Sequence, residues 1–118
     1  MDMLKKYEKL ITKYITEQKD KILREPSGKL PHKFIVPGAC YAQELWDWDS
    51  WLTDVAISNT LKTDEEKNAF SEYQKGCVLN FLDNMYDNGS IPFMTSGERT
   101  FCESESGESN GAKPVIVQ

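Results

Sequence analysis

Histidine and cysteine are scarce in this chain of 118 residues. The single histidine, His32, and the three cysteines, Cys40, Cys77 and Cys102, lie far apart in the sequence. A structural metal site needs several such ligands at close spacing, so we expect no metal site and no cofactor. Three cysteines do not form a disulfide framework, and the reducing cytoplasm is the expected compartment.

Basic residues are also in the minority, because 14 lysines and arginines stand against 19 aspartates and glutamates, giving a net charge of −5. Nucleic acids and anionic membranes attract basic surfaces, so neither is an expected partner. No apolar run approaches the roughly 20 residues of a membrane-spanning helix, and residues 1–6 lack the pattern of a signal peptide. A composition of 39% hydrophobic and 11% aromatic residues is typical of one globular domain.

Hydrophobic periodicity divides the first part of the chain into two segments. Residues 1–25 are predicted to form an N-terminal amphipathic helix, because apolar residues recur there at spacings of three and four up to residue 23. Pro26, Ser27 and Gly28 end this pattern. Residues 26–45 contain further breakers around one short apolar run, and they predict an extended entry segment with one short strand.

Residues 46–88 carry two more helical patterns, separated by only a few residues. The first predicted helix begins near residue 47 or 49 and ends at about residue 60. The second begins with a capping box, in which Thr63 and Glu66 satisfy free backbone N–H groups, and it is expected to end at Asn88–Gly89. The short connection predicts an antiparallel αα-hairpin.

Periodicity is lost in residues 89–118, which are rich in serine, glutamate and glycine until a short apolar run at 115–117. Long structureless loops are uncommon in compact domains, so this segment is interpreted as a loop followed by the start of a truncated element. We therefore expect residues 1–118 to be a single partial domain of the all-α class, built from helical hairpins. A disordered C-terminal tail is the alternative.

The densest group of residues suited to chemistry is the stretch ELWDWDSW at residues 44–51. Sugars present apolar C–H faces and a rim of hydroxyls, so tryptophan platforms interleaved with carboxylates suit a sugar site. Two other interpretations stay open. The tryptophans provide core bulk and the aspartates favour a helix start. Alternatively, Asp47 and Asp49 form an Asp-x-Asp metal–phosphate motif of a glycosyltransferase, which requires an extended backbone.

The stretch PGACYAQELWDWDSWL, residues 37–52, resembles the first trehalase signature, Pro-Gly-Gly-Arg-Phe-x-Glu-x-Tyr-x-Trp-Asp-x-Tyr. Glu44 takes the place of the signature Glu, Trp46 that of the Tyr, and Trp48 with Asp49 that of the Trp-Asp pair. Asn-Phe at 80–81, Gly-x-Ile-Pro at 89–92 and Lys-Pro at 113–114 resemble later trehalase motifs in the same order. Processing α-glucosidases and mannosylglycerate-hydrolase-like enzymes share this skeleton.

The departures from the trehalase pattern favour these two related groups over trehalose specificity. The signature arginine is absent, and Phe-Met follows Ile91-Pro92 in place of Asn-Gly. The resemblance implies an (α/α)6 toroid of helical hairpins, of which this chain would be the N-terminal part. It also implies an inverting glycosidase that acts on an α-linked glucoside or mannoside and binds an oligosaccharide or a small glycoside.

The resemblance also implies roles for individual residues. Trp48 would be a platform for the sugar ring and Asp49 an acceptor of its hydroxyls, with Trp46, Glu44 and Arg99 as further substrate contacts. The catalytic acid and base are expected downstream, in the missing C-terminal part of the same barrel, so this chain alone is expected to be inactive.

No catalytic residue is assigned within the chain. The glutamates between residues 98 and 108 lie on a loop with no apolar wall to raise their pKa, so they are expected to be solvated charges. His32 is expected to be a surface histidine and Cys40 a small packing residue. A competing hypothesis is a small helical module that binds a carbohydrate or a protein without catalysis.

Overall fold

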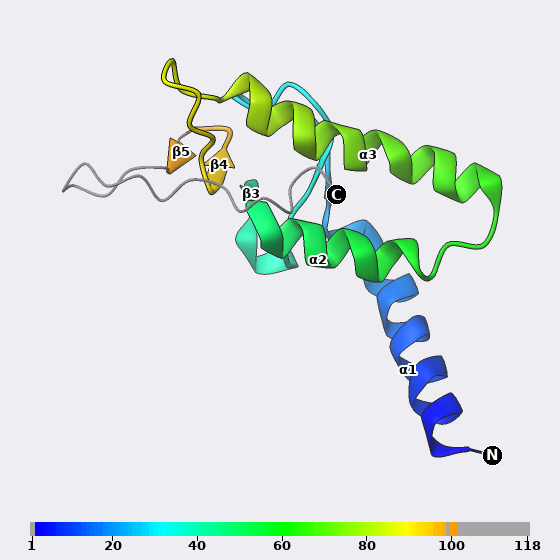
Figure 1. Ribbon diagram of the computed structural model, residues 1–118. Helices are drawn as coiled ribbons and strands as arrows, with labels where there is room; N and C mark the ends of the chain where they lie inside the picture. The colour runs from blue at the N-terminus through cyan, green and yellow to red at the C-terminus, as the bar shows by residue number, and fades with distance from the viewer. Residues whose placement is uncertain (1, 99, 102–118) are drawn as a thin grey trace.

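The computed structural model describes residues 2–98, 100 and 101. The helices are α1 (Met3–Gln18), α2 (Asp47–Ser58) and α3 (Asp64–Asp83), with 3-10 helices at Lys19–Lys21 and Ala39–Tyr41. The strands are β1 (Leu23–Arg24), β2 (Phe34–Ile35), β3 (Glu44–Trp46), β4 (Met94–Ser96) and β5 (Thr100–Phe101). Figure 1 shows α2 and α3 as two long neighbouring helices, from which α1 projects at an angle.

The prediction of an all-α fold is wrong, because the described residues also form two small antiparallel sheets, which makes the chain mixed α/β. β1 pairs with β2, and a second sheet has the order β3–β4–β5. Strands of two or three residues are too short to display alternation of apolar and polar side chains. The partner of residues 44–46 is the stretch 94–96, on the far side of the hairpin, so no local pattern reports the pairing.

Helix α1 is shorter than its periodicity predicted. It ends at Gln18, and the chain then turns so that the Ile22 carbonyl accepts the Val36 N–H at 3.0 Å and Leu23 pairs with Ile35. The last residues of the helical pattern therefore belong to the first sheet. None of the helices among the described residues combines the length and the apolar character needed to cross a bilayer.

Most of the apolar face of α1 lies in solvent. Its exposed fractions run from 52% to 75% for the large apolar side chains Met3, Leu4, Tyr7, Leu10, Ile11 and Tyr14. Near the C-terminal end of α1, Ile15 packs against the buried cluster around Ile35. The periodicity identified the helix correctly, but it did not indicate whether the apolar face would be covered.

Helices α2 and α3 run antiparallel and are joined by residues 59–63 (Figure 1). The Gln74 amide of α3 bridges to α2, donating to the Asp54 carboxylate at 2.7 Å and to the Ser58 hydroxyl at 3.1 Å. The predicted capping box is present: the Thr63 hydroxyl accepts the Glu66 N–H at 3.1 Å. The Glu66 carboxylate accepts the Lys62 N–H at 3.0 Å, and this hydrogen bond lowers the Glu66 pKa.

Strand β2 lies at the centre of the core and faces two clusters. Phe34 packs with Leu45 and Phe81 in one cluster, while Ile35 packs with Ile57 and Phe70 in the other. Successive strand residues point to opposite sides, so Phe34 faces one cluster and Ile35 faces the other. The two side chains thereby bring α2, α3 and β3 into contact with the same short strand. The extended entry segment is thus the packing centre of the described residues.

Two residues of α3 lock the helix onto this segment. A Cβ at Gly76 would overlap the Lys33 carbonyl oxygen, so only glycine permits this close approach. One turn further, the buried Asn80 side chain accepts the His32 N–H at 3.0 Å and donates to the His32 carbonyl at 2.9 Å. Asn80 therefore pairs with His32 as a neighbouring strand would.

The predicted end of the third helix at Asn88–Gly89 is wrong, because α3 ends at Asp83. The Asn84 side chain donates to the Lys29 carbonyl at 2.9 Å, a contact that holds the helix end against the entry segment. Gly89 does adopt a positive φ of 86°, but in a separate turn closed by its N–H and the Tyr86 carbonyl. The segment predicted as an irregular loop then contains β4 and β5, and the apolar run at 115–117 lies outside the described residues.

Candidate functional site

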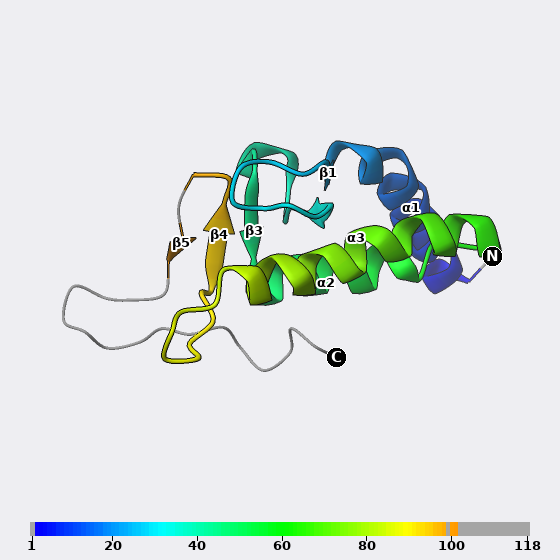
Figure 2. The same ribbon diagram turned by 90° about the horizontal axis from the view of Figure 1, so that it is seen from above.

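The junction of β3 and α2 holds four of the five residues that the sequence singled out. Trp46 ends β3 and caps α2, and its backbone N–H donates to the Ser50 hydroxyl at 3.3 Å. The Asp47 N–H donates to the Phe93 carbonyl at 3.0 Å, which extends the pairing of β3 with β4 into the first helical residue. The strand therefore runs into the helix without a loop (Figure 2), and the first turn of α2 is held in place by the sheet.

The loop before β3 is held by a contact that the sequence did not indicate. Ala42 has a φ of 50°, which is unusual for a residue with a Cβ. The Arg24 guanidinium donates to the Ala42 carbonyl at 2.8 Å. Arg24 lies in β1, so this hydrogen bond anchors the loop to the first sheet.

Trp46 is held by three neighbouring side chains. Its ring lies edge-on to Tyr41, with a centroid distance of 6.3 Å, and 6.0 Å from the Phe93 ring. Its indole N–H donates to the Glu44 carboxylate at 3.1 Å. Glu44 and Trp46 are two residues apart on a strand and share one face, which explains the contact. The indole N–H and part of the Trp46 ring are thus already engaged within the protein.

Trp48 and Asp49 follow in the first turn of α2 and are less constrained. The Trp48 side chain is 51% exposed, and Asp49 is half-buried. Among the described residues, the Asp49 carboxylate makes no hydrogen bond or ion pair. The partial positive charge of the helix N-terminus favours a carboxylate at this position, so the interpretation of Asp49 as a residue that supports the helix start also stays open.

The structure argues against the Asp-x-Asp interpretation. Asp47 and Asp49 both lie in α2, where residues two apart point about 200° away from each other. Asp47 is only 4% exposed, while Asp49 is half-buried. Within the described part of the chain, no group of three or more His, Cys, Asp or Glu side chains is placed to hold a metal ion.

Other candidate residues stand apart from this junction. Arg99 and the glutamates at 103, 105 and 108 lie outside the described residues. His32, for which no carboxylate partner was expected, has one: its Nε2 lies 2.8 Å from Asp83 Oδ2. Phe93 and Tyr41 were not predicted as neighbours of Trp46. Only the β3–β4 pairing brings Phe93 there, so its position had no signal in the sequence.

No family model, curated protein or solved structure matches the chain. The resemblance to trehalase-like enzymes therefore rests on the residues of the motifs themselves.

Proposed function

We propose that this chain carries the sugar-binding part of an inverting glycoside hydrolase that acts on an α-linked glucoside or mannoside. The observation that carries the proposal is the β3–α2 junction, which presents a half-exposed Trp48 and, at the next position of α2, an Asp49 carboxylate that makes no hydrogen bond or ion pair to the described residues. The free thiols of Cys40 and Cys77 fit a reducing cytoplasm.

The roles of the junction residues follow from their contacts. Trp48 offers an aromatic face for the C–H face of a sugar ring, and Asp49 offers oxygens to its hydroxyls. Trp46 and Glu44 already bond to each other, so we assign them the positioning of the loop and the helix start. Tyr41 and Phe93 pack on Trp46 and take part in the same positioning.

Hydrolysis with inversion needs two carboxyl groups about 6.5–9.5 Å apart, one as acid and one as base. We assign neither of them within this chain, so the hydrolytic part of the proposal rests on the motif resemblance. The competing function is a binding module without catalysis, and the exposed apolar face of α1 favours a protein ligand for it. Both functions use the tryptophans of residues 44–51, but only the glycosidase turns over a substrate.

Sugar binding is tested by titrating the 118-residue chain with methyl α-glucoside and methyl α-mannoside and measuring the bound fraction by saturation-transfer NMR. We expect Asp49→Asn and Trp48→Ala each to weaken binding by roughly tenfold, the effect of losing one charged hydrogen bond or one stacking surface. Leu52→Ala is the matched control, because Leu52 lies one turn along α2 and is equally exposed. Binding that is unchanged in both site variants would refute the sugar site.

Turnover is tested separately. The protein for this assay contains this chain together with the segment to which the proposal assigns the two catalytic carboxyl groups. It should release the β-anomer first from an aryl α-glycoside, as recorded by proton NMR. First release of the α-anomer would contradict inversion. Binding without any release would favour the non-catalytic module.

A further inference from the structure

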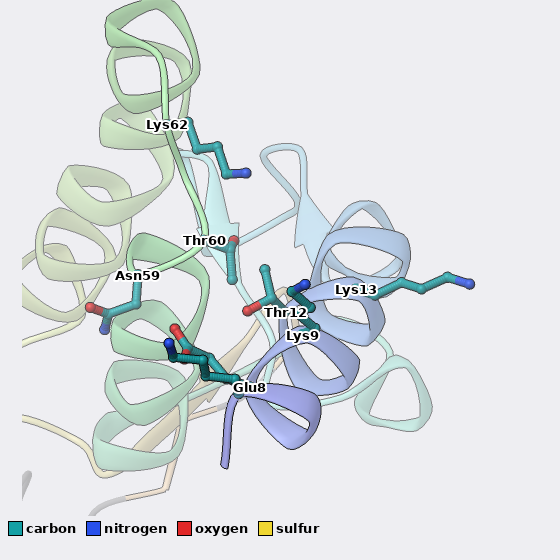
Figure 3. Close-up of a pocket in the computed structure, with 8 residues that line it drawn as sticks. Glu8, Lys9, Thr12, Lys13, Asn59, Thr60 and Lys62 are labelled. Carbon is teal, nitrogen blue, oxygen red and sulfur yellow. The ribbon is translucent and has the colours of Figure 1, made fainter. Parts of the chain in front are cut away.

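A basic cleft lies between α1 and the connection between α2 and α3 (Figure 3). None of its lining residues belongs to the stretch 44–51. It has a volume of about 540 Å³. Lys5, Lys9 and Lys13 line it from α1, and Lys62 lines it from the connection, with Glu8 as its acidic residue. Four lysines and one glutamate give this lining a charge of +3, in a chain whose net charge is −5.

The four lysines are not equivalent. Lys13 lies 3.8 Å from Glu17, and Figure 3 shows its side chain extending away from the other labelled residues. Lys62 extends toward α1 in the same view. Among the described residues, Lys5, Lys9 and Lys62 form no ion pair. Three ammonium groups thus border one cleft without an ion pair to the described residues, and of these Lys62 also attracts the Glu66 carboxylate and helps to lower its pKa.

Hydroxyl groups complete the lining. The Thr60 hydroxyl donates to the Ile57 carbonyl at 2.7 Å, so it has only its lone pairs to offer a ligand. The Thr12 hydroxyl makes no hydrogen bond to the described residues and is free to donate. One free hydroxyl donor among unpaired ammonium groups suits a ligand with several acceptor oxygens and negative charge.

We propose that this cleft binds the phosphate group of a small phosphorylated molecule. A phosphate monoester carries a charge of about −1.5 to −2 near neutral pH and three acceptor oxygens, so it matches the unpaired lysines in charge and Thr12 in hydrogen bonding. The concave arrangement concentrates the positive potential of the three lysines in one place. The negative charge of Glu8 opposes phosphate binding. Removing that charge should therefore strengthen binding, whereas removing a lysine charge should weaken it.

Inorganic phosphate is the probe, added to the ¹⁵N-labelled 118-residue chain at pH 7.5 with ionic strength held constant by sodium chloride. We expect amide shifts centred on residues 5–12 and 59–62. Lys9→Gln and Lys62→Gln should each weaken binding by roughly threefold or more, because each removes a charge from the cleft. Glu8→Gln should tighten binding by a similar factor, and added salt should weaken it throughout.

Lys6→Gln is the matched control, because it removes the same charge from the same helix at a position outside the lining of the cleft. We expect it to change the affinity by less than about 1.5-fold. All four positions are exposed, and far-UV circular dichroism verifies that each variant is folded. An equal loss in Lys6→Gln and Lys62→Gln, or no gain in Glu8→Gln, would show a diffuse charge effect and overturn the proposal.

Discussion

At the scale of single residues, Cys77 shows how burial decides the chemistry of a side chain. Its sulfur accepts the Ile35 N–H at 3.3 Å and packs against both core clusters. Burial raises the pKa of the Cys77 thiol to about 12, so it stays protonated at physiological pH. Cys40, by contrast, is exposed in the 3-10 helix that precedes β3, although it was expected to be a packing residue. Cys77 is therefore a packing residue.

This raised pKa predicts a pH dependence of stability. Above its ordinary pKa of about 8.5 the unfolded thiol releases its proton while the folded one keeps it, so the contribution of Cys77 is full below that pH and is lost as the pH rises toward 12. The loss between pH 8 and pH 10 should be roughly 1–2 kcal/mol. Urea unfolding at both pH values measures it. Cys40→Ala should retain the decline and Cys77→Ala should lack it; equal declines in the two variants would contradict the prediction.

At the scale of elements, the contact between α3 and the segment before β2 organises the fold. Gly76 removes the side chain that would separate the helix from the Lys33 backbone, and Asn80 hydrogen-bonds the His32 backbone one turn later. These contacts place Phe81 against Phe34 in the core. The strand is short, and it depends on the helix for its position.

Gly76→Ala should therefore destabilise the protein. In an exposed helix this change adds about 1 kcal/mol of stability, but here the new methyl group overlaps a backbone carbonyl and forces the helix away. We expect a net loss of about 2 kcal/mol, within the range of overpacked sites. Thermal unfolding measures the loss, and Lys75→Ala, an exposed neighbour, should change stability by less than about 0.5 kcal/mol. A higher melting temperature for Gly76→Ala would disprove the close approach.

At the scale of the whole molecule, the described residues combine a packed core with a projecting helix, α1, whose apolar face is exposed. The core is gathered around β2, while α1 extends outward with its apolar face in solvent (Figure 1). Contiguous apolar surface of this kind mediates association or dye binding. Helix α1 also carries three of the four lysines of the basic cleft, on a different face, so it presents two surfaces of different chemistry.

The exposed face of α1 should bind the dye anilinonaphthalene sulfonate. Replacing Tyr7 and Ile11 together by glutamine should reduce the dye fluorescence by about half or more, because these residues contribute a large share of the exposed apolar stripe. Urea unfolding should change little, since the two side chains are not packed in the core. Lys6→Gln on the same helix is the control. Undiminished fluorescence in the double variant would locate the dye elsewhere.

Long periodic segments were predictable, and short paired ones were not. The helices and the capping box at Thr63 follow from spacings of three and four residues, which act within a few turns of chain. The strands follow from pairing between distant segments, such as Leu45 with Thr95, and two or three residues carry no recognisable alternation. The end of α3 at Asp83 likewise depends on a distant contact, from Asn84 to Lys29.

The candidate site divides in the same way. The start of α2 was readable, so Trp48 and Asp49 could be placed in the first turn from local pattern alone. The contacts of Trp46 with Phe93 and Tyr41, and the anchoring of Ala42 by Arg24, could not be read from local spacing. A contact between positions tens of residues apart leaves no periodic trace in either segment.

By itself, the sequence determined where the chain coils into helices, which of their faces are apolar and where tryptophans and carboxylates gather, because these features depend on neighbouring residues. Only the tertiary structure decided that β2 is the packing centre, that α1 leaves its apolar face in solvent and that four lysines border one cleft. The burial of a residue and its neighbours in space depend on which distant segments of the chain meet. Those meetings are fixed by long-range backbone pairing and by the close packing at Gly76.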